Sequence, residues 1–243
     1  MITGTKKRIE NALVIMIGIS EYNDNKVWPN LSSVKEDDIK NFEQLFKQEL
    51  NYTFVYNSSP KMTKQDVQEF MDGVIIDHGL RKNTKKYDGL ILIICGHGNQ
   101  KDQGDALITS DGKNFPIDEF RNSFNCSQMQ SFEDFPKIFI IDICRNKSDS
   151  EPQKPATRGK KGLHKDDGFF IIWSTTKGNE TVDLSLFSET MNNIITSTYK
   201  SGYTLIQMLR DIRKELSNKN DYYCVENQDT TNYDIVFQQR KSV

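Results

Sequence analysis

The sequence has little that points to a membrane, to nucleic acid or to an oxidising compartment. Among its 243 residues, no apolar run approaches the roughly 20 residues that a membrane-spanning helix needs. A formal net charge of -2 leaves neither a basic footprint for nucleic acid nor a polybasic patch for a membrane surface. The four cysteines, at positions 95, 126, 144 and 224, form no CxxC pair and are too few for a disulfide scaffold. These absences predict a reduced, cytoplasmic protein that binds neither nucleic acid nor membrane.

Phosphate-binding and targeting signals are missing as well. There is no G-x-G-x-x-G and no GKS/T motif, which argues against a doubly wound nucleotide-binding module. The N-terminus places basic residues before an apolar run, as a signal peptide does, but Glu10 and Asn11 interrupt that pattern. We therefore interpret "ALVIMIG" (12–18) as a buried first strand.

What the sequence does contain is an alternation of strands and helices. Apolar, β-branched runs recur between segments with helical spacing, and this pattern is typical of a mostly parallel sheet covered on both faces. Thr63 is expected to begin one helix and Gly79 to end it. The segment around Asp111-Gly112 predicts a small hairpin. The expected strands are "ALVIMIG", "YTFVY", "YDGLILIICG", "KIFIIDIC", "GFFIIWST" and, last, "YDIVFQ"; further helices are expected at about 184–200 and 204–217.

Residues 145–167 break this rhythm, with many charges, two prolines and no apolar periodicity. Both sides of this stretch supply strands, so we interpret it as a surface loop within a single domain that spans residues 1–243. The predicted organisation is a large segment at about 8–146, a loop at 147–167 and a small segment at about 168–240.

Two strands end on reactive side chains: "LILIICGHGN" reaches His97, and "IFIIDICRNK" reaches Cys144. Functional groups collect at the carboxyl ends of parallel strands, so these two residues are expected to share one site. An imidazole next to a thiol lowers the pKa of the thiol and can later protonate a leaving amine. The backbone amides of Gly98 and Cys144 are then candidates for an oxyanion hole.

"GHG" after one buried strand and "DICRN" after another, about 50 residues further on, resemble the caspase-like cysteine peptidases, the clan of caspases, paracaspases and metacaspases. The resemblance runs from "ALVIMIG" to "YDIVFQ". It implies a caspase–haemoglobinase fold, a three-layer α/β/α sandwich around a mostly parallel six-stranded sheet. It also places His97 and Cys144 on the catalytic dyad of a peptidase that acts through a thioester acyl-enzyme.

The departures from true caspases concern the specificity pocket. The caspase motif Q-A-C-R-G reads Asp142-Ile143-Cys144-Arg145-Asn146 here, and Ser32 stands where caspases carry an arginine that binds substrate aspartate. The motif is closest to the paracaspase version, whose aspartate two residues before the cysteine lines an acidic S1 pocket. That resemblance adds Asp38 (or its neighbour Asp37) and Asp183 (or Glu180) as further S1 acids.

Three carboxylates in one pocket call for a cation, and the planar guanidinium of arginine matches them better than the point charge of lysine. We therefore expect protein or peptide substrates with P1 Arg, and P1 Lys second. The 147–167 loop itself offers Arg158-Gly159 and Lys161-Gly162 as sites of self-cleavage.

Several questions stay open at this point. No metal or other cofactor is favoured, although metacaspases commonly need calcium and Asp102, Asp105 and Asp111 make one loop acidic. The runner-up hypotheses are a calcium-dependent metacaspase-type peptidase and a catalytically silent caspase-like scaffold. The family suggests cell death or immune signalling without deciding between them, and a homodimer through the last strand is also open. Cys95, inside an apolar run, is expected to be inert packing, and Trp173 either walls the pocket or packs.

Overall fold

The fold is built on a six-stranded sheet, as expected. The computed structural model describes residues 5–82, 86–101, 104–125, 128–146, 168–179, 184–221 and 223–241. The strand order is β10-β9-β8-β4-β2-β3, with β10 antiparallel and the other strands parallel. Its strands are β2 (Ala12–Gly18), β3 (Thr53–Tyr56), β4 (Gly89–Cys95), β8 (Lys137–Asp142), β9 (Phe169–Trp173) and β10 (Glu226–Asp229).

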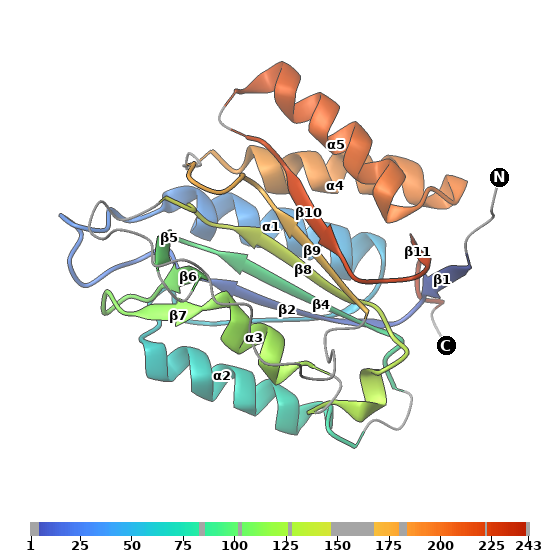
Figure 1. Ribbon diagram of the computed structural model, residues 1–243, viewed down its shortest axis with the longest axis horizontal. Coiled ribbons are helices and arrows are strands. Elements are labelled where there is room, and N and C mark those ends of the chain that lie inside the picture. Colours follow the sequence, from blue (N-terminus) through green and yellow to red (C-terminus); the bar gives the residue numbers. More distant parts are fainter. Residues whose placement is uncertain are drawn as a thin grey trace, which may run out of the picture.

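Helices cover both faces of this sheet and complete a three-layer α/β/α sandwich (Figure 1). The first helical stretch consists of α1 (Ile39–Phe42) with the π-helical turns η1 (Val34–Asp38) before it and η2 (Glu43–Glu49) after it. That stretch lies on one face with α4 (Leu186–Thr198) and α5 (Leu205–Lys219), and α2 (Lys64–Asp77) and α3 (Ile117–Ser123) lie on the other. Short 3-10 turns lie at η3 (Gln130–Phe132) and η4 (Tyr199–Ser201).

The central strands are apolar along their whole length because helices bury both of their faces. Every residue of β2 and β4 is buried. Alternate side chains point to opposite faces, so Ile91, Ile93 and Cys95 join the core under α1, α4 and α5, whereas Leu90, Leu92 and Ile94 join the core under α2 and α3.

The limits of α2 follow the signals expected from the sequence. Thr63 and Asp66 form a reciprocal capping box, in which each side chain accepts a hydrogen bond from the backbone N–H of the other residue. His78 closes the helix, and Gly79 follows with a φ of 62°, the left-handed conformation that glycine adopts most readily.

The last predicted strand forms where it was expected, but it is not a strand of the main sheet. "YDIVFQ" forms β11 (Asp234–Phe237), which pairs in parallel with β1 (Lys6–Ile9) in a separate two-stranded sheet. The sixth strand of the main sheet is instead β10, whose sequence "ENQD" has no apolar residue and so gives no strand signal. The prediction of a dimer through the last strand is not tested, but β11 is not an edge strand of the main sheet, whose two edge strands are β10 and β3.

A small three-stranded sheet lies beside the carboxyl ends of the central strands (Figure 1). It consists of β5 (Gly98–Lys101), β6 (Gly104–Ile108) and β7 (Asn114–Pro116). The β6–β7 hairpin around Asp111-Gly112 is the predicted one, and Gly112 has a φ of 74°. The pairing of β5 with β6 was not foreseen, and it fixes the chain immediately after His97.

Candidate active site

The carboxyl ends of β4 and β8 bring the "GHG" and "DICRN" segments together. The N–H of Gly96 donates to the carbonyl of Asp142 at 3.3 Å, and further on the N–H of Gln100 donates to the carbonyl of Asn146 at 2.7 Å. His97 and Cys144 lie within these two adjacent segments, as expected for the ends of neighbouring parallel strands.

The ring of His97 is held on several sides. Its Nε2 lies 2.7 Å from the carbonyl oxygen of Pro29, which can only accept a hydrogen bond, so Nε2 donates and Nδ1 is the basic nitrogen of the neutral ring. The ring centroid lies 4.8 Å from that of Tyr22 and 5.5 Å from that of Trp28. The backbone N–H of His97 donates to the Tyr22 hydroxyl at 2.9 Å. The segment that contains Tyr22, Trp28 and Pro29 therefore sets the tautomer and the orientation of the imidazole. No feature of the sequence indicated this role for the segment.

Gly98 has no side chain because the cysteine segment passes directly against it. A Cβ atom at this position would lie 2.5 Å from the carbonyl oxygen of Cys144 and 2.7 Å from the Cβ of Ile143. Both distances are shorter than real Cβ contacts, so only glycine fits without displacing the backbone after Ile143. Gly98 and Cys144, the two residues predicted to supply the oxyanion hole, are thus immediate neighbours in space.

Arg145, the residue after Cys144, is fully buried and paired with two carboxylates. Its Nη2 lies 2.9 Å from Asp105 Oδ2 on β6, and its Nη1 lies 2.8 Å from Glu226 Oε2 on β10. Its guanidinium lies over the ring of Trp173, 4.0 Å from the centroid. Asp142, the acid nearest to this arginine in the motif, is not its partner in either ion pair. The structure pairs it with two acids that are distant in sequence.

The backbone of Arg145 is also fixed on both sides. Its N–H donates to the carbonyl of Asn179 at 3.0 Å, and its carbonyl accepts from the N–H of Gly178 at 2.9 Å. A third backbone group, the carbonyl of Thr175, accepts from Arg145 Nη1 at 3.2 Å. The loop after β9 therefore holds the backbone that directly follows Cys144.

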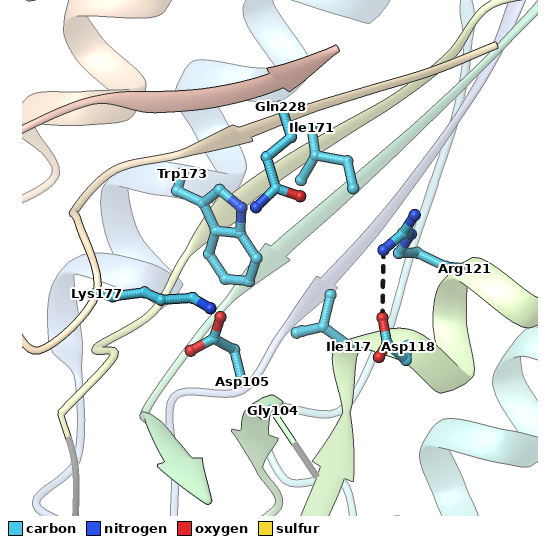
Figure 2. A pocket seen from close by; sticks show the side chains of 9 residues that line it. All are labelled: Gly104, Asp105, Ile117, Asp118, Arg121, Ile171, Trp173, Lys177 and Gln228. Carbon is cyan, nitrogen blue, oxygen red and sulfur yellow. Dashed lines mark hydrogen bonds and ion pairs between the residues drawn. The ribbon is translucent and has the colours of Figure 1, made fainter. Parts of the chain in front are cut away.

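A cavity of about 220 Å³ lies beside this arginine cluster (Figure 2). Trp173 and Ile171 of β9 form its apolar wall, and Figure 2 shows the Lys177 side chain directed toward Asp105. Trp173 packs on Arg145 and lines this cavity, but neither Asp38 nor Asp142 is among the lining residues, so its role as a wall of the S1 pocket stays a prediction. The remaining lining residues are Gly104, Asp105, Ile117, Asp118, Arg121 and Gln228.

Two of the three predicted S1 acids lie on the same face of the sheet. Asp142 is the strand partner of Cys95, and the pKa of the buried Cys95 thiol is raised by burial and further by the charges of Asp38 and Asp142. Asp38 is buried and its Oδ1 accepts a hydrogen bond from Ser188 Oγ on α4 at 2.5 Å. Its neighbour Asp37 is exposed, so of the two alternatives only Asp38 points inward. Both carboxylates are thus near enough to the buried Cys95 thiol for their charges to raise its pKa.

The remaining predicted residues of this site lie outside the described part of the chain. These are the third S1 acid, Asp183, its substitute Glu180, and the self-cleavage positions Arg158 and Lys161. Of the loop acids considered for calcium, Asp105 pairs with Arg145 and Asp111 pairs with Lys113 at 2.8 Å, whereas Asp102 is not described.

Such a site, on an α/β/α sandwich with histidine and cysteine at adjacent strand ends, defines the class of caspase-like proteins. The family model described as "Caspase domain" matches residues 11–237, and the chain belongs to this family, whose members are as a class cysteine peptidases. A solved structure, the initiator caspase Dronc of Drosophila, is similar in fold with a TM-score of 0.69. That match has 15% sequence identity and covers 93% of this chain and 82% of the other. No curated protein matches in the sequence comparison. Within the described residues, no helix is both long and apolar enough to cross a membrane.

Proposed function

We propose that the chain is a cysteine endopeptidase that cleaves after arginine, and less efficiently after lysine, through His97 and Cys144. The observation that carries the proposal is the hydrogen bond from His97 Nε2 to the carbonyl of Pro29, together with the position of the His97 segment beside the segment that contains Cys144. This bond assigns the proton of the neutral ring to Nε2 and makes Nδ1 available as the base.

The chemistry then follows in two steps. His97 Nδ1 takes the Cys144 thiol proton, the thiolate attacks the carbonyl carbon of the P1 residue, and the amides of Gly98 and Cys144 bind the developing oxyanion. The imidazolium returns its proton to the leaving amine, which departs and leaves a thioester. His97 next deprotonates a water that hydrolyses this thioester and restores the thiol. Every group required for these steps is protein or water, so the proposal includes no metal or other cofactor.

The acidic pair supports a basic P1 residue. Asp38 and Asp142 lie near one buried thiol, where the low dielectric strengthens both their mutual repulsion and their attraction for a cation. A guanidinium donates to two carboxylates at once, whereas an ammonium is a single point charge, and this favours Arg over Lys. The proposal includes Asp183 as the third S1 acid, as the family resemblance implies. It also includes self-processing after Arg158 or Lys161, because both are basic P1 residues of the kind that this pocket would accept.

Two alternative functions differ from this proposal in their need for calcium or in their activity. A metacaspase-type enzyme would make the same cut only with calcium, and a silent scaffold would make none. The presence of both His97 and Cys144 favours the enzyme over the scaffold. Protein substrates in the cytoplasm fit the absence of a disulfide framework.

The test is hydrolysis of matched fluorogenic peptides that end in Arg, Lys or Asp, with and without calcium. We expect cleavage after Arg that is lost in Cys144→Ala and in His97→Ala. It should be retained in Cys224→Ser, which removes an exposed thiol instead. Cleavage after Asp would overturn the acidic pocket and keep the dyad. Cleavage only with calcium would favour the metacaspase reading, and no cleavage of any peptide would favour the scaffold.

A further inference from the structure

The β5–β6 hairpin connects the two segments of the proposed dyad. It begins directly after His97, with Gly98 opposite Leu107 and Gln100 opposite Asp105. The carbonyl of His97 itself accepts from the N–H of Ile108 at 2.8 Å. Because these ladder bonds hold β5 to β6, any movement of β6 is passed on to the histidine segment.

Asp105 extends from this hairpin to the cysteine segment. Its Oδ2 accepts from Arg145 Nη2 at 2.9 Å and from Arg145 Nε at 3.2 Å. The side chain of Asp105 is 9% exposed and that of Arg145 is fully buried, so the pair is poorly screened by solvent. The guanidinium receives a second carboxylate from Glu226, but that residue is on β10, which pairs with β9 and is not part of the hairpin that follows His97.

We propose that Asp105 is a positioning residue, which sets the separation of His97 and Cys144 by joining the hairpin after the histidine to Arg145 after the cysteine. This inference rests on the proposed function. Asp105 does not contact the Cys144 thiol or the His97 ring and acts through Arg145. The backbone of Arg145 directly follows Cys144 and is hydrogen-bonded to Asn179 in the loop after β9.

The direction in which Asp105→Asn shifts the pKa of the Cys144 thiol distinguishes a positioning role from a purely electrostatic effect. Removing a negative charge close to Cys144 by itself favours the thiolate, so electrostatics alone would lower the pKa of the Cys144 thiol in Asp105→Asn. Loss of positioning moves the thiol away from His97, the group that stabilises the thiolate, and would raise that pKa toward the ordinary value of about 8.5.

The experiment is the pH dependence of Cys144 alkylation by iodoacetamide, followed peptide by peptide with mass spectrometry. The exposed Cys224 in the same samples serves as an internal reference thiol. The matched control is Glu226→Gln, which takes a carboxylate of the same charge from the same guanidinium. Asp105→Glu is the conservative variant, and the thermal unfolding of each variant establishes that it is folded.

We expect the wild-type Cys144 to titrate well below Cys224. In Asp105→Asn its apparent pKa should rise and kcat should fall with little change in KM, while Asp105→Glu recovers part of both. Glu226→Gln should leave the apparent pKa unchanged or lower it. An unchanged or lowered Cys144 pKa in Asp105→Asn would overturn the positioning role and leave the proposed function intact. Equal rises of that pKa in Asp105→Asn and Glu226→Gln would have the same meaning.

Two further outcomes have defined meanings. Failure of both Asp105 variants to fold would make Asp105 a residue of stability and would overturn the positioning role. A wild-type Cys144 that titrates like Cys224 would instead show that no dyad forms, which removes the proposed function and the inference with it.

Discussion

Asp142 and Cys95 are partners across the parallel β4–β8 pair, so a carboxylate at a strand end lies beside a fully buried thiol. Burial raises the pKa of Cys95, and the negative charges of Asp142 and Asp38 raise it further. The same geometry that brings together the proposed S1 acids therefore keeps a second, central cysteine protonated.

This relationship predicts that Cys95 stays unmodified by iodoacetamide in the native protein at mildly alkaline pH. The thiolate is the reactive form, and a raised pKa shifts its formation to higher pH, while burial denies the reagent access. Alkylation followed by peptide mass spectrometry should label Cys224 and Cys144 natively, and Cys95 only after denaturation. Native labelling of Cys95 at the rate of Cys224 would contradict the burial of this strand end.

Replacing the S1 acids should weaken cleavage after arginine selectively. A hydrogen bond between charged groups contributes about 2 kcal/mol, which corresponds to about thirtyfold in rate. We expect Asp142→Asn and Asp38→Asn each to lower kcat/KM for Arg peptides by about this factor. Glu36→Gln, an exposed acid near Asp38 in η1, is the control and should change little. Equal losses in all three variants would exclude a specific acidic pocket.

Gly98→Ala should damage the site far more than a glycine change elsewhere. The new Cβ would meet the Cys144 carbonyl and Ile143, and overpacking of this kind costs about 1–3 kcal/mol. The matched control is Gly73→Ala in α2, where a Cβ meets nothing within 4 Å and is expected to stabilise the helix by about 0.5–1 kcal/mol. Denaturant unfolding and peptide hydrolysis measure both effects. Full activity in Gly98→Ala would mean that the two segments are less closely packed.

The hydrogen-bonded carboxylate of Glu49 should contribute to the free energy of unfolding at neutral pH and lose that contribution in acid. The hydrogen bond from the Tyr199 hydroxyl lowers the pKa of Glu49, and the hydrogen bond and charge of Lys200 lower it as well. A carboxyl whose folded-state pKa is depressed stabilises the fold above its unfolded pKa and loses that contribution as the pH falls through the folded value. The difference in unfolding free energy between wild type and Glu49→Gln should therefore be under about 1 kcal/mol at neutral pH and shrink below the ordinary carboxyl range. Tyr199→Phe should reduce the same pH dependence. A wild-type advantage over Glu49→Gln that grows in acid would contradict a lowered pKa of Glu49.

The two central strand ends and the family were accessible from the sequence because their signals are local. Buried strands such as "GLILIIC" are continuous apolar runs, and a parallel sheet aligns their carboxyl ends, so His97 and Cys144 could be placed side by side without coordinates. The beginning and end of α2 were equally readable, since a capping box and a C-terminal glycine act within a few residues.

Elements whose stability comes from distant partners were missed. β10 is wholly polar and becomes a strand only by pairing with β9, and "YDIVFQ" has a strand pattern that does not reveal its partner, β1. The segment that holds His97 has no recognisable motif, and the contact that sets the tautomer is a backbone carbonyl, that of Pro29, which every residue possesses.

The sequence by itself determined the family, the order of the central strands and the adjacency of the two strand ends that carry His97 and Cys144. Only the tertiary structure decided which side chains neutralise one another. Arg145 follows Asp142 by three residues in the same motif, yet it forms ion pairs with Asp105 and Glu226 from two other strands. The physical reason is that a buried guanidinium must find carboxylates wherever the fold brings them within hydrogen-bonding distance, and that distance is unrelated to separation along the chain.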